Sequence, residues 1–319
     1  MPAASGIAAR RWSDRRHGSE ARRRMPPVAP DLRVVGDTTW KRGAMVTDWH
    51  LNQTFDFEGQ SIAYETFGKG EPVVLVHGTP FSSYVWRKIA PELARDRKVY
   101  VYDLLGYGQS EKAEGQDVSL GVQNTILAAL LRHWGLDRPK IVAHDFGGAT
   151  ALRAHLLDGC AYEKLLLIDP VAIRPWGSPF VQHVRRHEEA FAGVPEYLHR
   201  AILRAYLRTA MHRAVGDAEL EPYLAPWIGP AGQRAFYRQI AQMLVKYTDE
   251  VQPRYGNISC PVKLLWGADD QWIPTERGRE LTAMIPGCQF TEIVGSGHLM
   301  QEDAPEAIIA AALRFFASS

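Results

Sequence analysis

Cysteine is scarce in this sequence, and long apolar runs are missing from it. The chain of 319 residues has three cysteines, Cys160, Cys260 and Cys288, which lie far apart and form no CxxC motif. An odd, scattered set argues against a disulfide framework and a structural zinc site, and it favours a reducing cytoplasm. No apolar run approaches the roughly 18 residues that span a bilayer, so an integral membrane protein is excluded.

An excess of either charge is also lacking. The formal net charge is +1, which gives no support to a nucleic-acid or membrane partner. With 46% hydrophobic and 23% charged residues, the composition is that of an ordinary globular protein and excludes collagen and low-complexity disorder. The length allows one or two domains, and a single core with an insertion is common at this size.

The charge is unevenly distributed along the chain. Residues 1–44 carry ten Lys and Arg against four Asp and Glu, which leaves the remaining residues with a net charge of −5. This segment has little apolar periodicity and predicts a basic, disordered tail, with Met45 as the functional start. No apolar stretch of 7–15 residues follows its arginines, so a secretory signal is not predicted, whereas an Arg-rich transit peptide stays an alternative.

From Thr54 onward, short apolar segments alternate with segments of helical periodicity. This alternation predicts a mostly parallel sheet with helices on both faces. The expected strands are 54–58, 61–67, 72–76, 98–105, 140–143, 164–168, 262–266 and 289–294, and the expected helices include 118–134, 275–284 and 304–316.

The alternation is interrupted once, after the sixth strand. Residues 171–254 contain no convincing strand and are rich in Arg, His, Tyr and Ala at helical spacing. We expect a helical cap over residues 171–254, inserted into an α/β core formed by residues 45–170 and 255–319.

The segment Ala143–Gly148 is the most informative part of the chain. Small residues at 143, 147 and 148 allow a strand to turn sharply into a helix and expose the residue at the tip, Asp145. This is the pattern of the nucleophile elbow, G-x-S-x-G, with Ala in the first position and Asp in place of Ser. The alternative is an ordinary helix cap, a role that Asp favours. A cap alone does not need three small neighbours in this register.

Four further motifs follow the same order as in a known family. They are Val76–Pro80, Val101–Ser110, Leu265–Pro274 and Gly295–His298. Together with the elbow, they resemble the α/β-hydrolase fold family, specifically its aspartate-nucleophile branch of haloalkane dehalogenases, epoxide hydrolases and fluoroacetate dehalogenases. The resemblance covers residues 47–316. It implies an α/β-hydrolase fold and the order nucleophile, acid, histidine.

The resemblance assigns catalytic roles to Asp145, Asp270 and His298. Asp269 and Asp169 stay alternatives for the acid, because the first is adjacent in the same loop and the second follows the sixth strand. The backbone N–H groups of Thr79 and Phe146 are the expected oxyanion hole. His77 and His144 flank the site and are interpreted as structural.

An aspartate nucleophile changes the expected reaction. Its reference pKa is about 3.9, so it is ionised at neutral pH and attacks without a base. Attack at saturated carbon gives an alkyl ester, which persists, whereas attack on a carbonyl gives a reactive anhydride. His298 then activates the water that hydrolyses the ester. The expected partners are a small apolar substrate and water. No cofactor or metal is implied, and the oligomeric state is left open.

The leaving group separates two versions of this chemistry. Haloalkane dehalogenases bind halide through a Trp after the nucleophile and an Asn or a cap Trp, but here Phe146 and Thr79 occupy those positions. Epoxide hydrolases protonate the ring oxygen with cap tyrosines, and the segment Phe236–Arg238 makes Tyr237 the candidate acid. Substitute halide donors would be Trp176, Trp227 or Trp272, and the second tyrosine would be Tyr197 or Tyr206. An esterase and a non-catalytic binding protein are the remaining alternatives.

Overall fold

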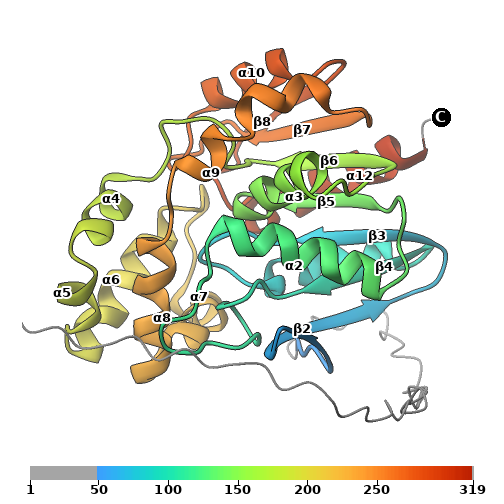
Figure 1. Cartoon of the computed structure of the whole chain (residues 1–319). Helices are drawn as coiled ribbons and strands as arrows, with labels where there is room; N and C mark the ends of the chain where they lie inside the picture. The colour runs from blue at the N-terminus through green and yellow to red at the C-terminus, as the bar shows by residue number, and fades with distance from the viewer. Residues whose placement is uncertain (1–48, 318–319) are drawn as a thin grey trace, which may run out of the picture. The chain divides into compact units, whose positions relative to one another are not determined.

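An eight-stranded sheet organises the computed structural model, which describes residues 49–317 (Figure 1). The predicted basic tail, residues 1–44, lies outside the described residues. The strands are β1 (Gln53–Phe57), β2 (Gln60–Phe67), β3 (Glu71–Val76), β4 (Arg97–Tyr102), β5 (Lys140–His144), β6 (Lys164–Ile168), β7 (Val262–Gly267) and β8 (Gln289–Ile293).

The strand order in the sheet is β1-β2-β4-β3-β5-β6-β7-β8. The β1–β2 and β2–β4 pairs are antiparallel, and the five remaining pairs are parallel. Every residue of β5 and β6 is buried, which is typical of strands covered on both faces. The predicted α/β fold with a mostly parallel sheet is confirmed.

Helices from both halves of the chain cover the two faces of the sheet. In Figure 1, α2 and α3 lie in front of the sheet and α12 lies behind it. The helices of this part are η1 (Ser83–Lys88), α1 (Ala90–Leu93), α2 (Leu120–His133), α3 (Phe146–Leu157), α10 (Thr275–Met284), α11 (Met300–Asp303) and α12 (Pro305–Ala317).

A second group of helices lies between β6 and β7, where the sequence predicts an insertion. We call this group the helical insertion, and in Figure 1 its helices α4 to α8 gather at one side of the sheet. Its members are α4 (Pro179–Arg186), α5 (Glu188–Ala192), α6 (Glu196–Arg208), α7 (Asp217–Leu224), η2 (Ala225–Trp227), α8 (Gly229–Ala241), α9 (Lys246–Asp249) and η3 (Gln252–Asn257).

One predicted strand is shorter than expected. The apolar run over residues 98–105 predicts a strand to its end, but β4 stops at Tyr102. The Asp103 carboxylate accepts backbone N–H groups from Ser83 at 2.7 Å and Gln109 at 2.6 Å. These bonds fold the next residues into a buried loop. Leu104 and Leu105 are therefore apolar because the loop is buried and not because they extend the strand.

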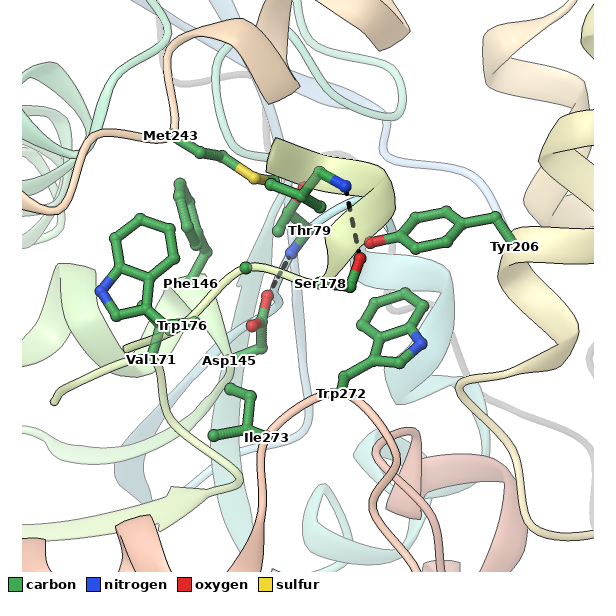
Figure 2. A pocket seen from close by; sticks show the side chains of 12 residues that line it. Thr79, Asp145, Phe146, Val171, Trp176, Ser178, Tyr206, Met243, Trp272 and Ile273 are labelled. Carbon is green, nitrogen blue, oxygen red and sulfur yellow. Dashed lines mark hydrogen bonds between the residues drawn. The ribbon is translucent and has the colours of Figure 1, made fainter. Parts of the chain in front are cut away.

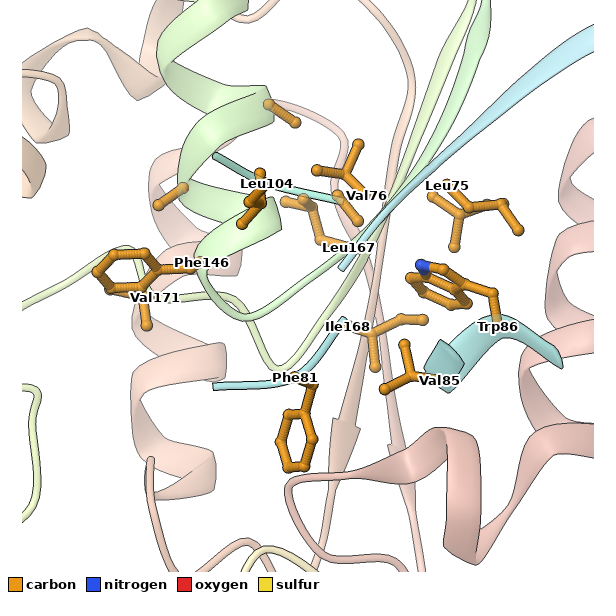
Figure 3. Packing of buried hydrophobic residues seen from close by; sticks show 14 of the residues in the cluster. Leu75, Val76, Phe81, Val85, Trp86, Leu104, Phe146, Leu167, Ile168 and Val171 are labelled. Carbon is orange, nitrogen blue, oxygen red and sulfur yellow. The ribbon is translucent and has the colours of Figure 1, made fainter. Parts of the chain in front are cut away.

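The apolar core lies against the sheet and reaches the turn that follows β5. Figure 3 shows side chains of β3 and β6 near those of η1, with Phe146 at the start of α3 on the far side. Trp86 is completely buried, and Phe146 is 2% exposed. Dense packing of this kind makes the ends of β3, β5 and β6 a rigid support for the residues that follow them.

Candidate active site

Asp145 occupies the sharp turn between β5 and α3. Its backbone has φ 51° and ψ −118°, a conformation that residues other than glycine rarely adopt. Neighbouring glycines provide the necessary space. A Cβ atom on Gly147 would lie 2.4 Å from the carbonyl oxygen of Val76, and one on Gly78 would lie 2.5 Å from the Asp145 Cβ. The small residues of the sequence motif are thus a steric requirement of the turn.

The Asp145 carboxylate is buried, yet it makes no capping hydrogen bond to α3. Its Oδ2 accepts the backbone N–H of Thr79 at 2.7 Å, and its Oδ1 lies 3.5 Å from Nε2 of His298. In Figure 2 the carboxylate lies among the pocket residues, with the dashed bond to Thr79 beside it. The alternative of an ordinary helix cap is therefore not what the structure contains.

His298 connects Asp145 to a second carboxylate. Its Nδ1 lies 2.8 Å from Oδ2 of Asp270, and this carboxylate also accepts the backbone N–H groups of Trp272 at 2.7 Å and Ile273 at 3.0 Å. The Trp272 ring stacks on the imidazole with 4.8 Å between centroids. Both ring nitrogens of His298 thus face carboxylates, in the order in which the sequence predicts them.

The two alternative acids lie elsewhere in the same region. Asp269 accepts the Gly295 N–H at 3.1 Å and approaches His212, so it is directed away from His298. Asp169 accepts the Gly267 N–H at 2.7 Å, while its Oδ2 is buried without a partner among the described residues. Of the three carboxylates, only Asp270 is hydrogen-bonded to His298.

Burial and neighbouring charges shift the pKa values of the ionisable groups at the site. Burial acts to raise the pKa of Asp145, but the hydrogen bond and charge of His298 hold it below its ordinary value. Burial acts to lower the pKa of His298, but the charges of Asp270 and Asp145 hold it well above its ordinary value. Burial and the Asp270 charge raise the pKa of Asp169, which favours its protonated form.

The two flanking histidines support loops. The His77 ring accepts the Leu104 N–H at Nε2 and donates from Nδ1 to the Gly78 carbonyl, each at 2.9 Å. His144 donates from Nε2 to the backbone carbonyl of His298 at 2.9 Å. Burial lowers the pKa of both rings, that of His144 to about 3, so both are neutral at physiological pH. These contacts agree with a structural role.

A small pocket opens beside Asp145, between the sheet and the helical insertion (Figure 2). Its free volume is about 30 Å³, and a water needs at least about 10–15 Å³ by this measure, so one or two waters fit. A larger ligand requires lining side chains to move. The lining residues are Thr79, Asp145, Phe146, Val171, Trp176, Gly177, Ser178, Val181, Tyr206, Met243, Trp272 and Ile273.

The three tryptophans considered as halide donors direct their N–H groups elsewhere. The indole of Trp176 donates to Thr248 Oγ1 at 2.9 Å, that of Trp227 to the Pro80 carbonyl at 2.8 Å, and that of Trp272 to Thr209 Oγ1 at 2.8 Å. Trp176 and Trp272 line the pocket through their rings. None of the three offers a free N–H to a ligand.

The three candidate tyrosines occupy different environments. Tyr237 is completely buried, its hydroxyl lies 3.0 Å from Nδ1 of His199, and it does not line the pocket. Tyr197 is 72% exposed. Tyr206 does line the pocket, and its hydroxyl has no hydrogen-bond partner among the described residues. The segment that resembles the family's tyrosine motif is therefore not the one that reaches the site.

Sequence reasoning did not single out Gln239, which contacts the site from the helical insertion. Its Oε1 accepts the hydroxyl of Thr79 at 2.7 Å and that of Tyr107 at 2.9 Å. A single glutamine in an amphipathic helix carries no recognisable signal, because the contact depends on how α8 docks.

Two general features of residues 49–317 bear on the class of protein. None of the helices there combines the length and the apolar character needed to cross a membrane. No group of three or more His, Cys, Asp or Glu side chains in this range is arranged to hold a metal ion.

Comparisons with known proteins give the family. The sequence model that describes the alpha/beta hydrolase family matches residues 73–312 of this chain. A soluble epoxide hydrolase of Corynebacterium sp. (strain C12) is 27% identical over 281 residues, which cover 81% of this chain and 94% of the relative. A haloalkane dehalogenase of Mesorhizobium japonicum is 30% identical over 270 residues, which cover 78% and 85%.

A solved structure is more similar still. An alpha/beta hydrolase fold protein from Burkholderia ambifaria is 54% identical with a TM-score of 0.82, and the match covers 83% of this chain and 98% of that one. The chain therefore belongs to the α/β hydrolase family of enzymes, as its fold and its relatives agree.

Proposed function

We propose that this hydrolase forms a covalent alkyl ester on Asp145 and then hydrolyses it with water activated by His298. One observation carries the proposal. The Asp145 carboxylate lies uncapped at a strained turn, bonded to the Thr79 N–H and 3.5 Å from His298 Nε2. A residue held in a rare backbone conformation at the edge of a pocket is typical of a nucleophile.

In the first step, Asp145 attacks a saturated carbon of the substrate. Its lowered pKa keeps the carboxylate ionised at neutral pH, so no general base is needed. A new carbon–oxygen bond forms at Asp145, and the bond from that carbon to the leaving group breaks. The helical insertion acts as a cap that closes over the substrate.

In the second step, His298 removes a proton from a water molecule that attacks the Asp145 carbonyl carbon. Asp270 holds the imidazole with Nε2 directed at Asp145. The backbone N–H groups of Thr79 and Phe146 stabilise the oxyanion, because the first already donates to the carboxylate and the second helps to lower its pKa. Breakdown of the intermediate releases the alcohol and restores the aspartate.

We infer that the leaving group is the oxygen of an epoxide and that Tyr206 protonates it. The Tyr206 hydroxyl borders the Asp145 pocket without another partner, and burial raises its pKa, so the proton is retained until the ring opens. The alkoxide takes this proton, and the proton released on hydrolysis restores the tyrosine. Tyr237, the acid that the sequence favours, is less suited because His199 engages its hydroxyl.

Haloalkane dehalogenation is the second candidate, favoured by the 30% identity to a haloalkane dehalogenase. It requires N–H donors for the departing halide. The indoles of Trp176, Trp227 and Trp272 all donate to protein acceptors, which supports the epoxide over the haloalkane.

The state of the cysteines supports a proposal for the cellular compartment of the enzyme. Cys160, Cys260 and Cys288 are all free thiols. Free thiols are typical of a reducing environment, and we propose that the enzyme acts in the cytoplasm.

Trapping the ester tests the chemistry. The His298→Gln variant is incubated with small epoxides and, separately, with small haloalkanes, and intact mass is measured. We expect an adduct on Asp145 that adds the whole mass of the epoxide. An adduct that adds only the alkyl group of a haloalkane would support dehalogenation instead. The Asp145→Asn/His298→Gln double variant is the control and should gain no mass.

Two tyrosine variants test the acid. Protonation by a positioned side chain contributes about 10²–10⁴-fold, so Tyr206→Phe should slow ester formation by at least about a hundredfold. Tyr237→Phe is the matched control and should retain most of the rate. If His298→Gln gains no adduct from substrates that the wild-type enzyme turns over, the mechanism is overturned. A slow Tyr237→Phe with a normal Tyr206→Phe would overturn only the assignment of the acid.

A further inference from the structure

A hydrogen-bonded link runs from the helical insertion to the residue that contacts the Asp145 carboxylate. Thr79 donates its hydroxyl to Gln239 Oε1 at 2.7 Å and its backbone N–H to Asp145 Oδ2 at 2.7 Å. Tyr107 donates to the same glutamine oxygen at 2.9 Å and lies 3.3 Å from Thr79 Oγ1. One threonine therefore connects a side chain of α8 to the proposed nucleophile.

The position of Gln239 is fixed from two directions. Arg238 of α8 donates to the Ala113 carbonyl, and Gln242, which follows the last residue of α8, accepts the Val118 N–H at 2.7 Å and donates to the Gln116 carbonyl at 2.9 Å. These bonds dock the helix on the loop before α2. Gln239 itself is 2% exposed.

The amide nitrogen of Gln239 does not explain why the residue is there. It is buried, and it has no hydrogen-bond partner among the described residues. An unsatisfied buried N–H is costly, so it does not contribute favourably to packing. The carbonyl oxygen makes all of the side chain's hydrogen bonds, and one of its two donors is Thr79, the residue that contacts Asp145.

We propose that Gln239 is a positioning residue that holds Thr79 so that its N–H stabilises the oxyanion during ester hydrolysis. The proposal rests on the proposed function. The effect of a hydrogen-bond donor on an oxyanion depends steeply on distance and direction. The hydrogen bond that anchors Thr79 to Gln239 should therefore affect the hydrolysis rate more than its own energy would suggest. Because the anchor belongs to the insertion, hydrolysis is faster when the insertion is docked.

A purely structural role predicts something different. If Gln239 only stabilised the packing of α8, its loss would lower the melting temperature or slow both steps together. Positioning of the oxyanion hole affects the second step, because a tetrahedral oxyanion forms only there. The ratio of the two rates therefore distinguishes the roles.

The test measures ester formation and ester hydrolysis separately in single turnovers of the full chain, by rapid quench and intact mass. Removing one oxyanion donor outright costs about 10²–10³-fold, and loosening it should cost less. We expect Gln239→Met and Thr79→Val each to slow hydrolysis about tenfold while ester formation changes less than about twofold. Thr79→Ser restores the hydroxyl and should recover most of the loss seen with Thr79→Val.

Two further variants complete the design. The Gln239→Met/Thr79→Val double variant should be no slower than either single one, because both break one link. Gln233→Met removes a buried glutamine of the same helix that donates only to the Ala192 and Val194 carbonyls, and it should change neither step. Equal slowing of both steps, or an unchanged hydrolysis rate in both single variants, would overturn the proposal. If no ester is trapped in His298→Gln, the proposed function fails instead.

Discussion

Asp145 and His298 have opposite pKa shifts that depend on each other. The charge of His298 lowers the pKa of Asp145, and the charge of Asp145 contributes to the raised pKa of His298. Esterification of Asp145 would remove its charge and with it one cause of the high His298 pKa. The imidazole would then lose its proton more readily at the stage that needs a base. These pKa shifts therefore suit Asp145 as the nucleophile of the first proposed step and His298 as the general base of the second.

The pH dependence of the two steps should differ as a result. In the proposed mechanism, ester formation requires ionised Asp145, whose pKa lies below its ordinary value of 3.8, so its rate should stay level down to about pH 4. Ester hydrolysis requires neutral His298 and should fall about tenfold per pH unit below the pKa of the imidazole in the ester. Single-turnover rates across pH 4–9 check both. A common pH profile for the two steps would contradict this division of roles.

At the scale of elements, the site is built where strands end. Asp145 follows β5, Asp270 follows β7 and His298 follows β8, and the carboxyl ends of parallel strands meet at one edge of the sheet. The turns at these ends require close approach of the backbone. A Cβ on Gly267, at the end of β7, would lie 2.3 Å from the Gly297 carbonyl oxygen, as tight as the approach at Gly147. The glycines are thus part of the site geometry.

Substitution at the elbow should therefore be costly for stability. In Gly147→Ala, the added Cβ would meet backbone atoms at 2.4 Å that have no free rotation. We expect a loss of about 1–3 kcal/mol in the free energy of unfolding, as for other overpacked positions. Gly256→Ala is the control, because a Cβ there meets nothing within 4 Å. Urea unfolding measures both, and equal stabilities would show that the elbow relaxes freely.

At the scale of the whole molecule, a buried cluster of charges joins the insertion to the rest of the enzyme. Glu302 of α11 accepts from Arg87 at 2.5 Å and Lys88 at 2.6 Å, both of η1. From the insertion it accepts the Tyr223 hydroxyl at 2.5 Å and Arg213 at 3.1 Å. Its side chain is 2% exposed. Burial acts to raise the pKa of Glu302, but its cationic partners lower it to about 2.

Loss of this carboxylate should destabilise the fold in a pH-dependent way. Folding favours the ionised form, so the contribution is complete above pH 4.5 and is lost as pH falls through about 2. The shift corresponds to about 3 kcal/mol. Glu302→Gln should therefore unfold more easily than wild type at pH 7, and the difference should shrink at pH 3.

The control is an exposed ion pair of the same charge type. Glu280→Gln breaks the surface contact between Arg277 and Glu280, and such pairs contribute about 0–1 kcal/mol. Free energies from urea unfolding at both pH values compare the two variants. A Glu302→Gln effect that does not change between pH 7 and pH 3 would show that the carboxylate charge is not what stabilises the insertion.

Local patterns are sufficient to predict the fold and the sharp turn at Asp145. The alternation of apolar strands and helices predicts the parallel sheet, because strands buried on both faces must be apolar throughout. The interruption after β6 predicts the insertion. Asp145 is identifiable because only small neighbours permit its turn. The apolar pattern wrongly predicts that β4 continues to Leu105, since burial and not strand geometry sets the apolar character of Leu104 and Leu105.

Sequence by itself determined the sheet, the insertion and the residue at the elbow, because each leaves a periodic or steric mark on neighbouring positions. Only the tertiary structure decided that Asp270 and not Asp269 meets His298, that Tyr206 and not Tyr237 lines the pocket, and that Gln239 reaches Thr79. These choices depend on the direction of single side chains and on how the insertion docks. Both follow from contacts between residues far apart in the chain, which no local pattern records.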